Sequence, residues 1–146
     1  MLNKERQEEV VELCQHLIQK QSYSGHEDGV AGVLEEQLKK KGFDSVTVDK
    51  YGNVIGCIKG NRPGKKILFD GHIDTVPVTD ETEWQYPPFA AEIHDGKIYG
   101  RGTSDMKGAV AGFVTAAAAF AEDTKKDFAG GTFSYEWGEL WFCEEV

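Results

Sequence analysis

Residues 67–78 read Ile-Leu-Phe-Asp-Gly-His-Ile-Asp-Thr-Val-Pro-Val, and this stretch decides the class of fold that we expect. Its first three residues form a short continuous apolar run, which predicts a strand buried on both faces of an α/β sheet. The strand leads directly into His72 and Asp74. Because residues i and i+2 of an extended segment project to the same face, these two side chains are expected to point together.

Two amphipathic helices are predicted before this stretch. The first runs to about residue 20, with apolar side chains at helical spacing. The second follows Ser24-Gly-His-Glu27, a capping-box pattern in which Ser24 accepts from the third backbone N–H while Glu27 reaches back. Gly42 suits the left-handed position that ends such a helix. The apolar positions of the first helix are Val10, Leu13, Cys14, Leu17 and Ile18, and those of the second are Val30, Val33, Leu34 and Leu38.

Strand patterns surround the central stretch on both sides. Residues 45–49 and 54–58 predict a hairpin, and residues 92–99 predict a smaller one with an Asp95-Gly96 turn. An Ala-rich helix is expected over residues 107–121, with Val110, Phe113, Val114, Ala117 and Phe120 as its buried stripe. A last strand is expected within residues 131–146, ending at Cys143-Glu-Glu145. This order of elements predicts an α/β layered domain.

Composition and charge narrow the possible partners. The 146 residues carry a formal net charge of −9, so nucleic acid and anionic membranes are poor partners. No apolar run approaches the ~20 residues of a membrane span, and the N-terminus is too charged for a secretory signal. Three widely spaced cysteines without a CxxC motif indicate reduced thiols. We therefore expect a cytoplasmic protein.

Three groups of residues could carry chemistry, and each has a simpler explanation. His72 with Asp74 matches a carboxylate-oriented metal ligand, or a His that happens to lie near an Asp. Asp105, in a Gly-rich turn before a helix, could bridge two cations or cap that helix. Glu144 and Glu145 could divide metal binding and proton transfer between them, or form a solvated pair.

Taken together and in order, these motifs resemble a known family. Gly71-His-Ile-Asp-Thr-Val-Pro77, the loop with Trp84 and Pro88, and Asp95-Gly-Lys-Ile-Tyr-Gly-Arg-Gly-Thr-Ser-Asp-Met-Lys-Gly108 are similar to the co-catalytic zinc deacylases and exopeptidases. That family includes acetylornithine deacetylase, succinyl-diaminopimelate desuccinylase, aminoacylase and glutamate carboxypeptidase. The resemblance is densest from residue 68 to residue 108. It implies a zinc-exopeptidase-like catalytic domain with a mixed, mostly parallel sheet flanked by helices.

The resemblance also implies a role for each site residue. His72 and Glu145 would be metal ligands, and Asp105 would bridge two ions. Asp74 would orient His72, and Glu144 would be the general base. The implied cofactor is a pair of Zn²⁺ ions, with Co²⁺ or Mn²⁺ as alternatives, and the implied reaction is hydrolysis of amides in N-acyl amino acids or short peptides. A cis peptide bond is implied between Asp105 and Met106.

The family pattern continues beyond what this sequence contains. A further carboxylate ligand, a distal His ligand and a lid domain that forms the homodimer interface have no counterpart, and His16, His26 and His94 do not match the missing ligand. We therefore expect residues 1–146 to form the N-terminal portion of one catalytic domain, inactive on its own. The alternative hypothesis is a non-catalytic α/β remnant with a structural or interaction role.

Overall fold

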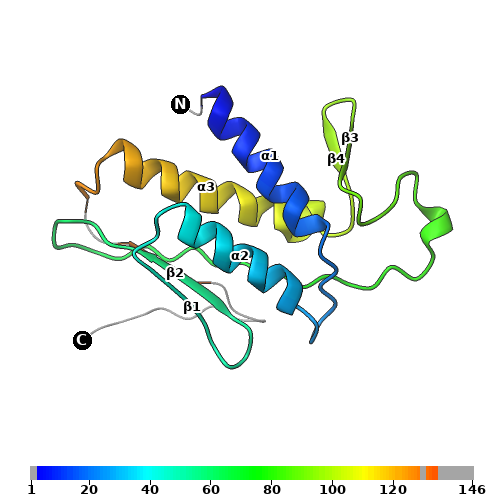
Figure 1. The fold of residues 1–146 in the computed structure, drawn as a ribbon, viewed down its shortest axis with the longest axis horizontal. Coiled ribbons are helices and arrows are strands. Elements are labelled where there is room, and N and C mark those ends of the chain that lie inside the picture. Colours follow the sequence, from blue (N-terminus) through cyan, green and yellow to red (C-terminus); the bar gives the residue numbers. More distant parts are fainter. Residues whose placement is uncertain (1–2, 129–130, 135–146) are drawn as a thin grey trace.

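The computed structural model describes residues 3–128 and 131–134, and in it three helices pack against a small sheet (Figure 1). Helix α1 spans Lys4–Ile18, α2 spans Asp28–Lys40 and α3 spans Gly108–Asp123. Strands β1 (Ser45–Val48), β2 (Val54–Ile58) and β5 (Gly131–Ser134) form one sheet. Strands β3 (Glu92–His94) and β4 (Lys97–Tyr99) form a separate hairpin. The α/β class predicted from the sequence is confirmed.

The first two helices form where the apolar spacing predicted them, but one of their caps differs. Asn3 caps α1 by accepting from the Arg6 backbone N–H at 2.9 Å. The expected capping box at the start of α2 is wrong: the N-cap is Glu27, without a side-chain cap bond. Glu27 does reach back, but to the Gly25 N–H at 2.7 Å, and the Ser24 hydroxyl turns instead toward Asp74. The Ser24 hydroxyl thus donates to a distant carboxylate, Asp74, instead of accepting from a backbone N–H of the helix that follows it.

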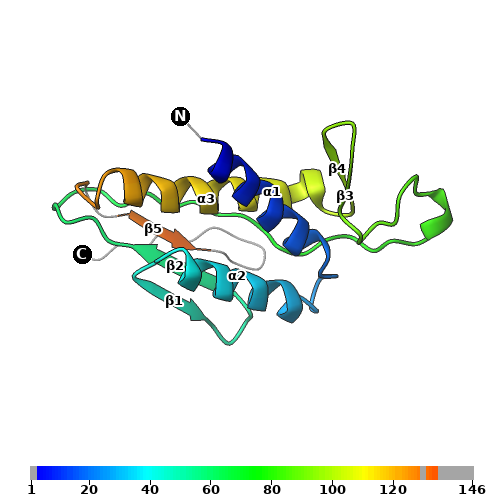
Figure 2. The ribbon, with the colours of Figure 1, turned by 45° about the horizontal axis from the view of Figure 1, so that its top comes forward.

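The larger sheet has the order β1-β2-β5, and both of its ladders are antiparallel. Ser45 pairs with Cys57 and Val48 with Val54, so the predicted hairpin is confirmed. Along β2 alternate residues are buried, because one face of the strand lies against the helices. Figure 2 shows β5 beside β2, with α3 running nearby. Within the described residues the strand ladders are all antiparallel, where a mostly parallel sheet was predicted.

Residues 67–69 do not form the doubly covered strand that their apolar run predicts. Ile67 is 61% exposed and Phe69 is 41% exposed, and the chain is extended there without strand assignment. Phe69 stacks on Phe113 of α3, with ring centroids 6.0 Å apart, which covers one side of the segment. Burial on both faces would require a second covering layer, and the described part of the chain supplies none at Ile67.

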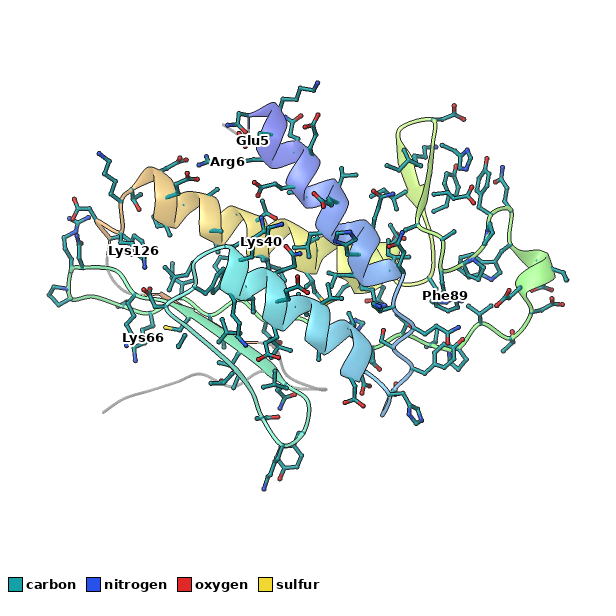
Figure 3. The ribbon with its side chains drawn as sticks, in the orientation of Figure 1. Glu5, Arg6, Lys40, Lys66, Phe89 and Lys126 are labelled. Atoms are coloured by element: carbon teal, nitrogen blue, oxygen red, sulfur yellow. The ribbon has the colours of Figure 1, made fainter. Side chains whose placement is uncertain are left out.

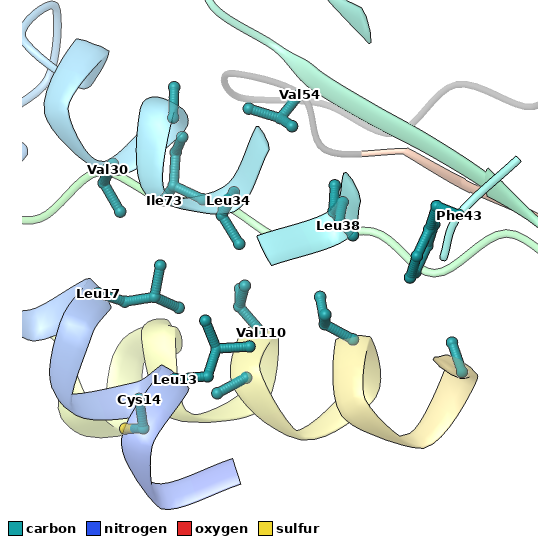
Figure 4. Packing of buried hydrophobic residues seen from close by; sticks show 14 of the residues in the cluster. Leu13, Cys14, Leu17, Val30, Leu34, Leu38, Phe43, Val54, Ile73 and Val110 are labelled. Carbon is teal, nitrogen blue, oxygen red and sulfur yellow. The ribbon is translucent and has the colours of Figure 1, made fainter. Parts of the chain in front are cut away.

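The hydrophobic core lies among the three helices and the inner face of β2 (Figure 4). Leu34 and Val110 are fully buried, and Ile73 brings the central stretch into the same core. In α3 the expected stripe is buried at Val110, Val114 and Ala117 and partly buried at Phe113, whereas Phe120 is 53% exposed and packs on Phe128 with ring centroids 4.9 Å apart. Other members of the core are Leu13, Cys14, Leu17, Ile18, Val30, Leu38, Phe43, Val54 and Ile58. Among the described helices none is long and apolar enough to cross a membrane.

Ion pairs connect the end of α3 to α1 and to the β1 region. Arg6, near the start of α1 in Figure 3, donates to both carboxylate oxygens of Asp123 at the end of α3, at 2.6 and 2.7 Å. It also contacts Glu122 at 2.9 Å. Lys126 pairs with Asp44 at 2.5 Å, joining the end of α3 to the start of the β1 region. These contacts connect the C-terminal end of α3 to α1 and to the region of β1.

Candidate active site

The extended segment 71–76 is held from one side by the connection between α1 and α2. The Ser22 hydroxyl donates to the Ile73 carbonyl at 2.8 Å, and the Thr75 N–H donates to the Ser22 carbonyl at 2.7 Å. Tyr23 and Thr75 form an isolated parallel bridge. Ser22 and Thr75 are both buried, so the backbone between them has little freedom. This segment carries His72 and Asp74.

Asp105 comes from a second segment, the irregular turn η2 (Thr103–Lys107) that precedes α3. Gly102 opens this turn with φ +84°, a left-handed conformation that glycine adopts without strain. Asp105 and Met106 have non-helical backbone angles, and the peptide bond between them is cis, as the family resemblance implied. Asp105 is not the N-cap of α3; that position is Lys107, without a side-chain cap bond.

The two segments bring His72 between two carboxylates. Its Nε2 lies 2.8 Å from Asp105 Oδ1, although the residues are 33 positions apart in the chain. Its Nδ1 lies 3.1 Å from Asp74 Oδ1 and 3.2 Å from the Asp74 carbonyl. The expectation that His72 and Asp74 point together is therefore confirmed. Burial by itself would lower the pKa of His72, but the hydrogen bonds to Asp105 and Asp74 outweigh it and raise that pKa above its ordinary value.

Asp74 is held in turn by a residue far away in sequence. The Ser24 hydroxyl donates to Asp74 Oδ2 at 2.5 Å, across 50 positions of chain. The two oxygens of Asp74 thus have different partners, His72 on Oδ1 and Ser24 on Oδ2. The contacts form one continuous chain from Ser24 through Asp74 and His72 to Asp105.

A buried lysine lies behind this chain of contacts. Lys107 is 0% exposed, and its Nζ donates at 2.8 Å to the carbonyl of Lys20, in the connection between α1 and α2. Burial lowers the pKa of Lys107 to about 8, although Cys14 and Asp74 act in the opposite direction. The bond joins the turn that carries Asp105 to the same α1–α2 connection that holds the Asp74 segment. Lys107 therefore belongs to the framework of the site.

A cavity of about 290 Å³ opens on these residues. Its lining includes His72, Asp74, Asp105, Thr75 and Arg101. Thr75 and Arg101 lie within the motifs of the family resemblance, but the sequence analysis assigned neither of them a role in the site. A larger hollow of about 350 Å³ lies among α1, α2 and α3 and includes His16. The lining of this larger hollow does not include His72 or Asp105, so the smaller cavity is the candidate active site.

The facing pair fits a divalent metal by the chemistry of its donors. One ring nitrogen of the imidazole faces a carboxylate, and the other lies opposite an Asp oxygen. Such a set of donors is typical of zinc sites. The Asp105 side chain is 86% exposed, so its carboxylate is accessible. Within residues 3–128 and 131–134, no group of three or more His, Cys, Asp or Glu side chains could hold a metal ion. Glu144 and Glu145, the other predicted site carboxylates, lie outside the described residues.

The remaining histidines have other surroundings, in agreement with the sequence interpretation. His94 stacks on Tyr86 with ring centroids 3.7 Å apart and pairs with Glu92 at 2.7 Å. His26 is exposed before α2. The structure places neither of them in the cavity that His72 lines.

Comparison with solved structures defines the class of protein. An M20 family metallo-carboxypeptidase from Sulfolobus solfataricus superposes with a TM-score of 0.76 at 27% identity, over 92% of this chain and 31% of that one. Human carnosine dipeptidase 1 has the same fold, with a TM-score of 0.76 at 22% identity, over 90% of this chain and 32% of that one. The architecture around His72 and Asp105 is thus part of a metallopeptidase-type catalytic domain.

Sequence comparison specifies the family. Residues 68–131 match the model for peptidase family M20/M25/M40, which places that part of the chain in this family. Succinyl-diaminopimelate desuccinylase from Beijerinckia indica is 39% identical over an alignment of 130 residues, and the match covers 84% of this chain and 33% of that protein. The same enzyme from Roseobacter denitrificans is 39% identical over 82% of this chain and 32% of its own length. The chain spans about one third of the length of these relatives.

Proposed function

We propose that this chain supplies one wall of the active site of a metal-dependent hydrolase that cleaves amide bonds in N-acyl amino acids or short peptides. The observation that carries the proposal is the 2.8 Å approach of His72 Nε2 to Asp105 Oδ1, with Nδ1 held by Asp74. These residues lie inside the region that matches the family. One relative of the same fold, from Bacillus subtilis, is described as a dinuclear metal-binding peptidase.

In this proposal each residue has a separate task. His72 and Asp105 would hold a Zn²⁺ ion, with Co²⁺ or Mn²⁺ as alternatives, and Asp105 would be shared with a second ion. Asp74 keeps the Nδ1 proton of His72 in place, so that the Nε2 lone pair faces the ion. A bound divalent ion would supply Lewis-acid polarisation of the scissile carbonyl and acidify a water molecule. Glu144 would accept a proton and pass it to the leaving amine, and Glu145 would be a further ligand.

We also propose that the isolated 146-residue chain has no hydrolytic activity. The described residues place one imidazole and one directly facing carboxylate at the site, whereas catalytic zinc typically keeps three protein ligands. We therefore expect no turnover of N-succinyl or N-acetyl amino acids or of dipeptides by the purified chain with added Zn²⁺. Robust turnover would contradict this part of the proposal.

For the full-length protein we propose a homodimer located in the cytoplasm, acting on small molecules.

A chimera tests the activity itself. Residues 1–131 of this chain would replace the matching third of a succinyl-diaminopimelate desuccinylase, and hydrolysis would be measured with and without Zn²⁺. We expect metal-dependent activity that His72→Ala or Asp105→Ala abolishes and that Ser45→Ala, on the exposed strand β1, retains. A folded chimera that has no activity, or one whose activity survives His72→Ala, would favour the non-catalytic alternative.

A further inference from the structure

The wall of the candidate active-site cavity contains a positive charge that no carboxylate neutralises. Arg101 is the only lysine or arginine among the residues that line this cavity. Asp74 and Asp105 line it too, but neither forms an ion pair with the Arg101 guanidinium, and within residues 3–128 and 131–134 no other carboxylate does. Because the chain has 25 Asp and Glu against 16 Lys and Arg, the missing partner does not reflect a shortage of carboxylates.

Arg101 is held in place by two contacts that leave its charge intact. Its backbone N–H donates to the Pro88 carbonyl at 2.7 Å. Its guanidinium lies over the ring of Trp84, with Cζ 4.9 Å from the ring centroid. A cation over an aromatic face is attracted to it but keeps its full charge. The side chain is thus positioned without being neutralised.

The same wall has polar atoms whose hydrogen-bonding capacity the chain does not use. Nε of Arg101 and Oγ1 of Thr75 are buried and have no hydrogen-bond partner among the described residues. In the described part of the chain only three buried side-chain atoms are in this state, and these two belong to residues that line the cavity. Thr75 packs close to Gly102, the residue after Arg101, because a Cβ on Gly102 would lie 2.7 Å from Thr75 Cγ2. A buried polar group without a partner is unfavourable, so this wall is suited to a ligand that supplies one.

The chemistry of a guanidinium selects the class of ligand. Its planar N–H donors match the two oxygens of a carboxylate, and a charge-assisted pair of this kind is stronger than a hydrogen bond between neutral groups. The substrates in the proposed function, N-acyl amino acids and short peptides, carry at least one carboxylate apart from the amide that is cleaved. A neutral group at the same position would leave Arg101 without a counter-charge, and an ammonium group would be repelled.

We propose that Arg101 is a specificity-determining residue: its guanidinium binds a carboxylate of the substrate, in the cavity that His72 and Asp105 also line. The identity of the substrate rests on the proposed function. Carboxylate binding at Arg101 is a property of this chain and needs no metal. The alternative is that Arg101 serves only to stack on Trp84, in which case its loss would lower the stability of the chain and change the affinity of no ligand.

The test measures binding of succinate to the 146-residue chain by ¹H–¹⁵N NMR, with a chelator present so that no metal contributes. Because Nε of Arg101 is shielded from water, its N–H should exchange slowly enough to be observed. We expect succinate to shift this signal, and succinamide, the neutral diamide with the same carbon skeleton, to leave it in place. Arg101→Gln should weaken succinate binding by about 10-fold or more, since it removes a hydrogen bond to a charged group. Arg101→Lys, which keeps the charge but not the planar donors, should have an intermediate affinity.

Arg62→Gln is the matched control, because it makes the same change at an arginine whose side chain is 61% exposed and already pairs with Asp127 at 3.0 Å. It should leave succinate binding unchanged. The inference is overturned if succinate does not move the Arg101 signal, if succinamide binds equally well, or if Arg101→Gln binds succinate as the wild type does. The comparison of succinate with succinamide on the wild type decides the question even if Arg101→Gln does not fold. Succinate binding that Arg101→Gln abolishes, together with a folded desuccinylase chimera that is inactive with Zn²⁺, would support the role of Arg101 and refute the proposed function.

Discussion

Replacing Gly102 with alanine should separate the two segments that form the site. A Cβ at this position would lie 2.7 Å from Thr75 Cγ2 and 3.3 Å from Lys107 Cδ, both in buried side chains. Its φ of +84° costs a residue with a Cβ about 1–2 kcal/mol. Accommodating the extra methyl group adds about 1–3 kcal/mol. Together these give a loss of about 2–5 kcal/mol, a large fraction of the ~5–15 kcal/mol that stabilises a typical domain.

The matched control is Gly112→Ala, the same chemical change in the interior of α3. No atom lies within 4 Å of the Cβ that it would add, and the helical backbone suits alanine. We expect this variant to be more stable by about 0.5–1 kcal/mol. Thermal and urea denaturation followed by circular dichroism measure both variants, and Gly102→Ala should lower the Tm by roughly 4–20 °C. If Gly102→Ala is as stable as the wild type, or if Gly112→Ala loses as much, the steric argument is wrong.

The other predictions concern the core, the acid limb of stability and metal binding. Leu34→Ala should cost about 2–5 kcal/mol because Leu34 is fully buried, whereas Val11→Ala, at a 36% exposed position, should change stability by less than about 0.5 kcal/mol; urea denaturation compares them. Burial alone would raise the pKa of Asp44, but the Lys126 ammonium and the Lys59 backbone N–H outweigh it and hold that pKa below its ordinary value. The stabilisation from Asp44 should therefore be present above the ordinary carboxyl pKa and disappear as the pH falls through the lower pKa of the folded state. Asp44→Asn should accordingly lower the free energy of unfolding by at most about 1 kcal/mol near neutral pH and leave it unchanged in strong acid. Zn²⁺ should raise the Tm of the wild type, and His72→Ala should lose this rise while His26→Ala, at an exposed position, keeps it; equal shifts in both variants would exclude His72 as a ligand.

Local patterns predicted the elements that are stabilised locally. The β3–β4 hairpin formed at Asp95-Gly96, whose φ angles of 50° and 73° are those the turn pattern requires. Gly42 has the predicted left-handed φ of 77° after α2. In both cases the residues that decide the structure lie within a few positions of one another. No knowledge of the rest of the chain was needed.

Predictions that depended on distant partners were less accurate. The apolar run at residues 67–69 predicted coverage on two faces, but coverage is decided by elements elsewhere in the chain, and Ile67 is 61% exposed. The antiparallel pairing of β5 with β2 likewise joins residues more than 70 positions apart, so no local pattern could predict it. At Phe120, helical spacing placed the ring on the buried stripe, yet it lies beyond the core and packs on Phe128.

The site shows the same division, with one informative exception. His72 and Asp74 could be paired from their spacing alone, but the approach of Asp105 depended on the turn at Gly102 and was available only through the family resemblance. Ser24 is the exception, because its sequence pattern gave a definite local prediction that the structure contradicts. A capping residue that forgoes its cap for a bond to a distant carboxylate runs against local consistency. Such departures are expected at functional sites, where a side chain is held for what it contacts rather than for the helix it begins.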